Sequence, residues 1–234
     1  MSSTRAKLLA AAAQTVRESG VAAASARAIA ARAQVNQALV FYHFGTVSEL
    51  LEAACRQAVD DSAAYYRDQF ATVTSLSGLL AVGRELHERE RSAGNVAMMA
   101  QFMSGAQHDP VLARAAHYAM SRWTSEIEEV VGRVLQDSPL AEIADVPGLA
   151  RALGAGFIGL ELYEGVDAAG MARALESLDQ LALVVEVVND LGPIARRALR
   201  SKLRSRQPRT PKRQYTNHTD RVLRPAESTR SGDQ

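Results

Sequence analysis

Apolar side chains recur at intervals of three and four residues through most of the 234-residue chain. That period places them on one face of an α-helix, and no segment keeps the strict alternation of a β-strand. The pattern therefore predicts an all-α fold. It places helices at residues 4–18, 26–33, 37–44, 47–71, 78–91, 95–103, 110–135, 147–163 and 171–191, and a further one that reaches residue 200.

Capping residues stand where these helices should begin. Thr4 is placed to cap the first helix, Ser25 the second and Asn36 the third, because short polar side chains accept hydrogen bonds from free backbone N–H groups. Thr46 and Glu49 form a capping box, in which each side chain serves the backbone N–H of the other residue. Such signals favour three short helices before residue 47.

The segment 25–49 reads as two short helices joined by a tight turn, followed by the start of a long helix. In a helix-turn-helix the second helix enters the major groove of DNA with its N-terminal end first. Its outer face here carries Gln37, Phe41, Tyr42 and His43. Glutamine reads adenine, and tyrosine and histidine donate to phosphates, so the pattern predicts a head that reads DNA.

Three stretches, RAKLLAAAAQTVRESG, SARAIAARAQV and LVFYHFGTVSELL, resemble the N-terminal domain of the TetR family of transcriptional regulators. The resemblance is specific over Arg5–Leu51. It implies an all-helical homodimer, a ligand pocket in the C-terminal domain and release from a DNA operator when a small molecule binds. The function expected is that of a repressor, with a double-stranded DNA operator, a second copy of the chain and an unidentified small-molecule effector as partners.

Two departures from the family pattern affect the head. The usual turn glycine is Gln34 here, so the turn is expected to form without a freely left-handed residue. A lysine that often lies near a phosphate is Val47. Gln37 is the first candidate for reading a base, and Ala38 and Phe41 are candidate contacts to thymine methyls. The full set of residues expected to bind DNA is Ser25, Arg27, Asn36, Gln37, Ala38, Phe41, Tyr42, His43 and Thr46.

Charge is distributed unevenly along the chain. Residues 1–50 carry five Lys or Arg against two acidic residues, residues 51–195 carry 10 against 21, and residues 196–234 carry 12 against three. Only the two ends are therefore suited to a polyanion. We expect a helix-turn-helix domain at 1–46, a ligand-binding and dimerisation domain at 47–203, and a basic, disordered tail at 204–234, which either adds non-specific phosphate contacts or has no role.

The last two long helices of the body are the candidate dimer surface. Each has an apolar stripe, and two such helices per subunit would form a four-helix bundle with a second copy, although both stripes could instead face the subunit's own core. The stripe residues are Leu149, Leu153, Gly156, Leu160 and Tyr163 on the first helix and Leu175, Leu178, Leu181, Ala182, Val185 and Val188 on the second.

Candidates for the ligand pocket are the large apolar and aromatic residues between the head and this surface, since such pockets are mostly apolar. They are Tyr66, Phe70, Met98, Met99, Phe102, Met103, His117, Tyr118, Trp123 and Phe157. Each of them could equally be a core residue.

Other chemistry finds little support in the residues. Gly154–Gly159 match G-x-G-x-x-G, but the preceding residues read as helix rather than strand, so no cofactor is expected. His87 is predicted to lie on a solvated helix face, no metal site is expected, and Cys55 is predicted to be a small buried residue.

No nucleophile and base stand together, so an enzyme of the helical-bundle kind is the weaker alternative, and a non-specific, nucleoid-type DNA binder is another. The single cysteine and the lack of a long apolar run favour a cytoplasmic protein. The residues do not identify the effector, the operator, the regulated genes or the direction of regulation.

Overall fold

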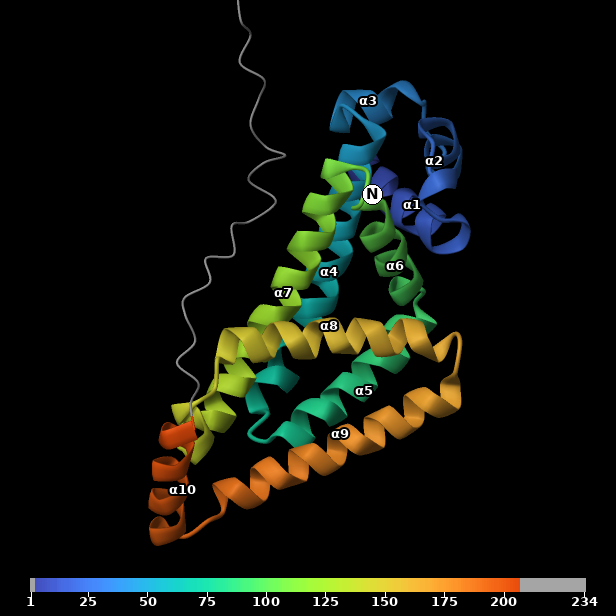
Figure 1. Cartoon of the computed structure of the whole chain (residues 1–234). Coiled ribbons are helices and arrows are strands. Elements are labelled where there is room, and N and C mark those ends of the chain that lie inside the picture. The colour runs from blue at the N-terminus through green and yellow to red at the C-terminus, as the bar shows by residue number, and fades with distance from the viewer. Residues whose placement is uncertain (1–2, 207–234) are drawn as a thin grey trace, which may run out of the picture.

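The computed structural model describes residues 3–206, which form ten α-helices and two short 3-10 helices and contain no strand. Figure 1 shows their arrangement. In chain order they are α1 (Thr4–Ser19), η1 (Val21–Ala23), α2 (Ala26–Ala33), α3 (Ala38–Phe44), α4 (Val47–Thr72), α5 (Leu76–Ser92), α6 (Asn95–Gly105), α7 (Pro110–Leu135), η2 (Pro139–Glu142), α8 (Val146–Glu164), α9 (Ala168–Asn189) and α10 (Pro193–Arg206). The all-α prediction is thus confirmed.

Local capping signals set most helix starts. Ser25 accepts from the Ala28 N–H at the start of α2, and Asp109 accepts from the N–H groups of Val111 and Leu112 at the start of α7. The prediction for α1 was off by one residue, since Ser3 rather than Thr4 is the N-cap and accepts from Ala6. Ser3 and Thr4 are neighbours that both carry a hydroxyl group, so either of them could accept a hydrogen bond from a free N–H in the first turn.

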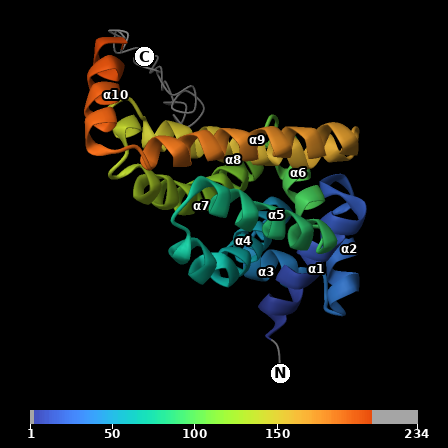
Figure 2. The same cartoon turned by 90° about the horizontal axis from the view of Figure 1, so that it is seen from below.

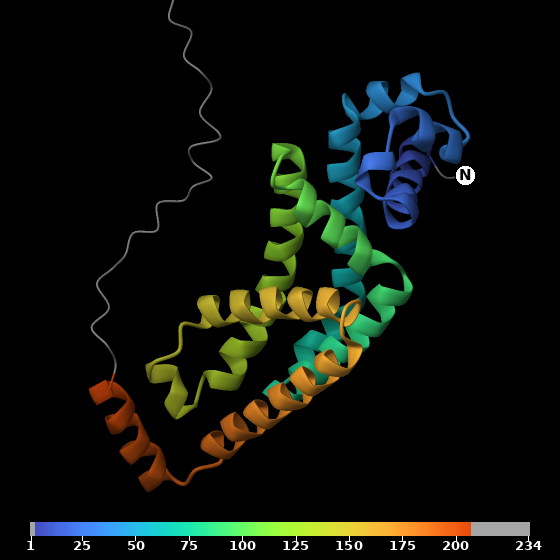
Figure 3. The same cartoon turned by 45° about the vertical axis from the view of Figure 1, so that its right-hand side comes forward.

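The helices α1, α2 and α3 form a head at one end of the molecule, and α4 and α7 run from it side by side into the body (Figures 1 and 3). In the body, α8 and α9 meet at a hairpin and diverge, with α5 between them (Figure 3). Seen from below, α8 and α9 form an outer layer over α7 and α5, and the head lies on the other side (Figure 2). The helix α10 stands at the end of the body farthest from the head.

Two hydrophobic clusters stabilise this arrangement. The larger one joins the head to the body, because it contains Leu8, Ile29 and Val40 from the head together with Met98 and Phe102 from α6. The same cluster includes Cys55, which is fully buried as predicted, and burial raises the pKa of its thiol to about 12. A head that shares its core with α6 is not an independent, freely hinged unit.

The second cluster lies deeper in the body, between α4, α5 and α7, and includes Tyr66, Phe70 and Val130. No helix within residues 3–206 is long and apolar enough to cross a membrane. The predicted disordered tail lies mostly outside the described residues. Its first residues, Arg204–Arg206, are part of α10, so the helix extends past the predicted boundary at 203.

Candidate DNA-binding head and effector cavity

The turn between α2 and α3 is made by a left-handed residue. Gln34 has φ 55° and ψ 46°, and its N–H donates to the carbonyl of Ala31. The turn therefore uses the left-handed conformation although, as the sequence indicates, it has no glycine to adopt it freely. A left-handed residue is needed here to cap the free carbonyls at the end of α2. The backbone adopts this conformation at Gln34, although it costs a residue other than glycine about 1–2 kcal/mol.

Asn36 positions the N-terminus of α3, the helix that is predicted to read DNA. Its side-chain oxygen accepts from the Ala38 N–H at 2.8 Å, which matches its expected role as a cap, although α3 begins at Ala38 rather than Gln37. Gln37 precedes the helix and is exposed. An exposed amide at this end is the side chain that would approach a base edge first.

Most residues expected to contact DNA lie on the surface of the head. Eight of them are exposed, and Tyr42 has 81% of its surface accessible and Phe41 has 49%. His43 is the exception, being half-buried between Tyr42 and Phe44, with ring centroids 5.0 and 6.3 Å away. The exposed residues are Ser25, Arg27, Asn36, Gln37, Ala38, Phe41, Tyr42 and Thr46. Large exposed aromatics are unusual on a free surface and fit a surface that meets a partner.

The capping box at the start of α4 forms in part. The Glu49 N–H donates to the Thr46 hydroxyl oxygen at 3.1 Å, as predicted. Glu49 does not reach the Thr46 backbone, whose N–H donates instead to the carbonyl of Phe44. The carboxylate accepts from the Thr46 hydroxyl at 2.9 Å, so this hydroxyl is already engaged and would have to leave Glu49 before donating to a phosphate.

The basic side chains of the head differ in whether an acidic side chain already binds them. Arg32 is paired with Glu18 at 2.5 Å, whereas Arg27 and Lys7 form no ion pair with any residue in 3–206. The Arg5 guanidinium lies 5.1 Å from the Phe44 ring centroid, at the C-terminal end of α3. Arg5 was not among the predicted DNA contacts, because only the tertiary fold brings the start of α1 beside α3.

The body contains a cavity of about 720 Å³ bounded by α4 to α9. Its wall is mainly apolar, and Met98 and Met99 on α6 belong both to this wall and to the core that the head shares. Among the predicted pocket residues, those that line it are Phe70, Met98, Met99, Trp123 and Phe157. Volume and composition are those of a small-molecule site.

The other five predicted pocket residues do not line this cavity. Tyr66 and Phe102 are fully buried core residues, and Met103 packs against the core beside the head. His117 is exposed, and the Tyr118 hydroxyl donates to Asp60 at 2.7 Å. Residue type alone did not separate cavity wall from core, because both are apolar.

A chain of polar side chains leads from the cavity wall to the head. Glu90 accepts from the Ser62 hydroxyl at 2.7 Å and from the Asn95 amide at 2.6 Å, and all three residues line the cavity. The Asn95 oxygen in turn accepts from Arg17 Nε of α1 at 2.9 Å. The stem of Arg17 lies against Gly94, whose left-handed φ of 74° begins α6.

His87 is buried, with 7% of its surface accessible, so its predicted place on a solvated face was wrong. Its Nδ1 lies 3.3 Å from Glu161 Oε1 and its Nε2 lies 3.0 Å from Glu164 Oε2. Burial raises the pKa of Glu161 to about 7, although the hydrogen bond with His87 opposes the rise. The one sign in the sequence of a buried polar group here is Glu161, a carboxylate that shares a helix face with the apolar Leu153 and Phe157.

The predicted dimer residues divide between two environments. Leu149, Gly156, Tyr163 and Leu181 are exposed, whereas Ala182 is buried and Val185 and Val188 are half-buried. Leu153, Leu160, Leu175 and Leu178 line the cavity, and so do the exposed Gly156 and Tyr163. Further apolar residues on the outer face were not predicted, namely Leu162, Val166, Leu183, Val184 and Val187.

Glycines of the G-x-G-x-x-G pattern lie inside α8, which agrees with the helical reading of this stretch. A side chain at Gly154 would come 3.1 Å from Thr124 of α7, so this glycine allows close packing. At Gly156 and Gly159 an added Cβ would meet nothing within 4 Å. Both of these glycines belong to the wall of the cavity.

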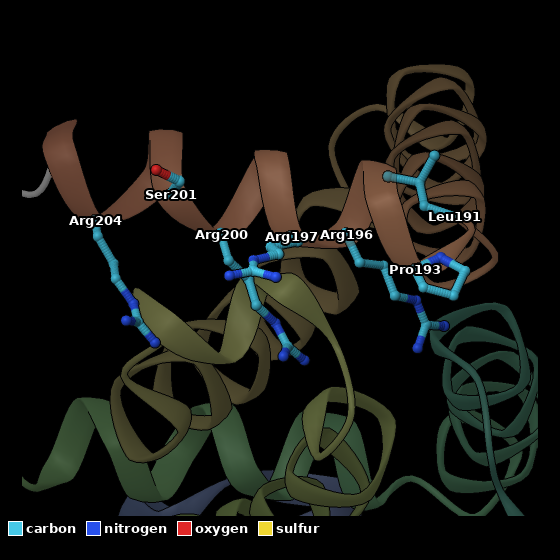
Figure 4. Close-up of a pocket in the computed structure, with 7 residues that line it drawn as sticks. All are labelled: Leu191, Pro193, Arg196, Arg197, Arg200, Ser201 and Arg204. Atoms are coloured by element: carbon cyan, nitrogen blue, oxygen red, sulfur yellow. The ribbon is translucent and has the colours of Figure 1, made fainter.

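Arginines of α10 bond this helix to the end of α9 and to the connector between α7 and α8. Figure 4 shows Arg196, Arg200 and Arg204 with the other residues that line a groove here. Arg196 donates to the carbonyl of Asn189, Arg200 to that of Asp137, and Arg204 forms two hydrogen bonds with Glu142 at 2.6 and 2.8 Å. These cations serve the fold, and their helix lies far from the head of the same chain (Figure 1).

Comparison with known proteins identifies the head. Residues 8–54 match the model of the bacterial regulatory proteins of the tetR family. These residues form a DNA-binding domain of the TetR family. The match covers most of α1, all of α2 and α3 and the start of α4, and it includes every residue expected to contact DNA, so the head is the DNA-binding domain of a regulator.

Solved structures share the fold of the body as well as that of the head. A transcriptional regulator from Rhodococcus sp. Rha1 is 24% identical, with a TM-score of 0.62 over 81% of this chain and 100% of its own. The multidrug binding protein EbrR, complexed with imidazole, is 24% identical, with a TM-score of 0.59 over 78% and 96%. A Saccharomonospora viridis protein in complex with choline is 18% identical, with a TM-score of 0.61 over 75% and 93%. A comparison with curated proteins found no significant match.

Proposed function

We propose that the protein is a cytoplasmic, homodimeric repressor that is released from its operator when a small molecule occupies the cavity. One observation carries this proposal: the wall of the cavity and the core of the head are built from the same residues of α6. Met98 and Met99 line the cavity and pack in the cluster that contains Leu8 and Ile29. Close-packed side chains cannot move independently, so a shift of α6 must move the head.

The hydrogen-bonded chain from Glu90 through Asn95 to Arg17 gives a second connection. A ligand that draws the Glu90 carboxylate toward itself weakens its bond to Asn95, and the orientation of Asn95 sets the bond to Arg17 on α1. A ligand shifts the equilibrium only if it binds the released state more tightly than the DNA-bound state. The ligand complexes of EbrR and of the Saccharomonospora viridis protein support small-molecule binding in a cavity of this fold.

We further propose that the outer faces of α8 and α9 form the dimer interface. Leu183, Val184 and Val187 on α9 and Leu162 and Tyr163 on α8 are exposed in the single chain, with accessible fractions of 45 to 59%. Large apolar side chains that are exposed together on one face normally mark an interface. Two-fold pairing through it would present two heads to two half-sites, which a weakly basic head requires for useful affinity.

We propose domain limits of 1–46 for the head and 47–203 for the body, and α4 contributes residues to the cores of both. Gln37 is proposed to read a base and Ser25, Arg27, Tyr42 and His43 to hold phosphates. Arg5 is added to this group because it lies beside the end of α3.

The test is a fluorescence-anisotropy titration with DNA from the region upstream of the protein's own coding sequence and with a selected random pool. The proposal expects binding that is sequence-specific at moderate salt and that weakens in the presence of a ligand. Equal affinity for all sequences, unchanged by Gln37→Ala, would instead support the nucleoid-type alternative.

A further inference from the structure

The cavity wall is mainly apolar, and its two acidic residues are buried. Trp123, Phe157 and Met98 are among the apolar residues of the wall, while Glu90 and Glu161 expose only 8 and 7% of their surface. An ionised carboxylate in such a place is costly unless a cation or several donors compensate for lost water. The partners of each carboxylate therefore show what the cavity lacks.

Glu90 is held by neutral donors alone. Its two oxygens accept from Ser62 and from Asn95, and no Lys, Arg or His nitrogen of residues 3–206 lies within 4.0 Å of them. Hydrogen bonds from neutral groups solvate the carboxylate, but they leave its charge uncompensated inside an apolar wall. A positive charge in the cavity would be attracted to it through a medium of low dielectric constant.

Glu161 has an oxygen to spare. Oε1 faces His87, whereas Oε2 accepts no hydrogen bond from any described residue. His87 also faces Glu164, so a single imidazole is shared by two carboxylates. The one arginine on the cavity wall, Arg84, is already paired with Asp179 at 3.0 Å. The cavity thus holds more negative than positive charge.

We propose that the cavity binds a hydrophobic organic cation, with its positive charge held by Glu161 and Glu90 and its apolar body against Trp123 and Phe157. This inference rests on the proposed function only in taking the cavity as the effector site. A cation over an aromatic face gains further attraction from the ring quadrupole. A neutral ligand would leave both carboxylates unpaired, and an anion would be repelled by them.

The experiment uses two ions of nearly the same shape and opposite charge, tetraphenylphosphonium and tetraphenylborate. Trp123 is the only tryptophan of the chain and lines the cavity, so its fluorescence reports occupancy directly. Binding of the phosphonium on the order of a hundredfold tighter than that of the borate is expected. Equal affinities, or preference for the borate, would overturn the inference.

Isosteric variants assign the charge. Glu161→Gln and Glu90→Gln should each weaken phosphonium binding by about tenfold or more, because each variant removes one buried ion pair with the phosphonium. The control is Glu88→Gln on the same helix, because Glu88 is exposed, pairs with Arg91 and does not line the cavity. Unchanged affinity in both cavity variants, with a folded protein by circular dichroism, would contradict the assignment.

A pH series distinguishes a charge effect from a change of shape. The phosphonium does not titrate, and the ionisable groups that face Glu161 are His87 and Glu90 on α5 and Glu164 on α8. Since the pKa of Glu161 is raised to about 7, affinity should increase as the pH rises through 7 in the unmodified protein. In Glu161→Gln this increase should disappear, and its persistence there would count against Glu161.

The two proposals can fail separately. DNA binding is measured on a sample without either ion, so loss of the cation inference leaves the regulator function standing. If the phosphonium binds through the glutamates but does not weaken the DNA complex, the cation site holds and release by a ligand is refuted.

Discussion

Replacing Glu161 by glutamine should change how stability depends on pH. The carboxyl group has a pKa of 4.5 when exposed to water and about 7 in the folded protein, where burial disfavours its charged form. The folded state therefore binds the proton more tightly than the unfolded state does. Stability from this group is fully present below pH 4.5 and is lost as the pH rises through 7.

The magnitude follows from the two pKa values. Each tenfold change in ionisation equilibrium is worth about 1.4 kcal/mol, so ionisation of Glu161 lowers the free energy of unfolding by roughly 2 to 3 kcal/mol between pH 5 and pH 8. Glu161→Gln lacks this ionisation in both states. Relative to the unmodified protein, the variant should gain that amount of stability over the same interval.

Urea unfolding at pH 5, 6, 7 and 8 measures this difference, at one fixed protein concentration because association also stabilises the folded chain. Titration of the other groups is common to both proteins and largely cancels, and Glu88→Gln serves as the exposed control. A difference that stays constant within about 0.5 kcal/mol, or that falls as the pH rises, would refute the reasoning from burial.

Four further predictions follow from single contacts. Gln34→Gly should raise the thermal midpoint by stabilising the fold by about 0.5–1 kcal/mol, because glycine adopts the left-handed turn freely; Gln34→Ala should not do so. Gln37→Ala should cost about 1–3 kcal/mol of DNA binding at one base position only, seen by titrating single-base operator variants. Val184→Glu should shift the mass measured by native mass spectrometry from dimer to monomer, whereas an unchanged dimer would place the interface elsewhere. Arg17→Met keeps an apolar stem but loses the bond to Asn95, so DNA affinity measured without ligand should persist while its response to tetraphenylphosphonium shrinks; a full response would exclude this connection.

The head could be predicted because its signals are local. Helix periodicity, the caps at Ser25 and Asn36 and the turn to α4 involve residues within a few positions of each other. The left-handed turn at Gln34 is local too, since the need to cap α2 overrides the backbone preference of a residue other than glycine. The structure of a short segment can be predicted from its sequence when its hydrogen bonds form within the segment itself.

The cavity could not be predicted in the same way. Phe102 and Met98 are both large, apolar residues of one helix, yet only Met98 lines the cavity. His87 looked solvated because the carboxylates that bury it are 74 and 77 positions away on α8. Which face of a helix meets a void, a core or solvent depends on where other helices cross it.

By itself the sequence determined that the chain is helical, approximately where its helices begin, and that its first 50 residues contain a DNA-binding head. Tertiary structure alone decided that two glutamates, Glu90 and Glu161, face one apolar cavity, and that Arg17 of the head is bonded to its wall. The physical reason is the range of the interactions. Helix caps and periodicity act over three or four residues, whereas the charge inside a cavity is set by side chains that only the packed fold brings together.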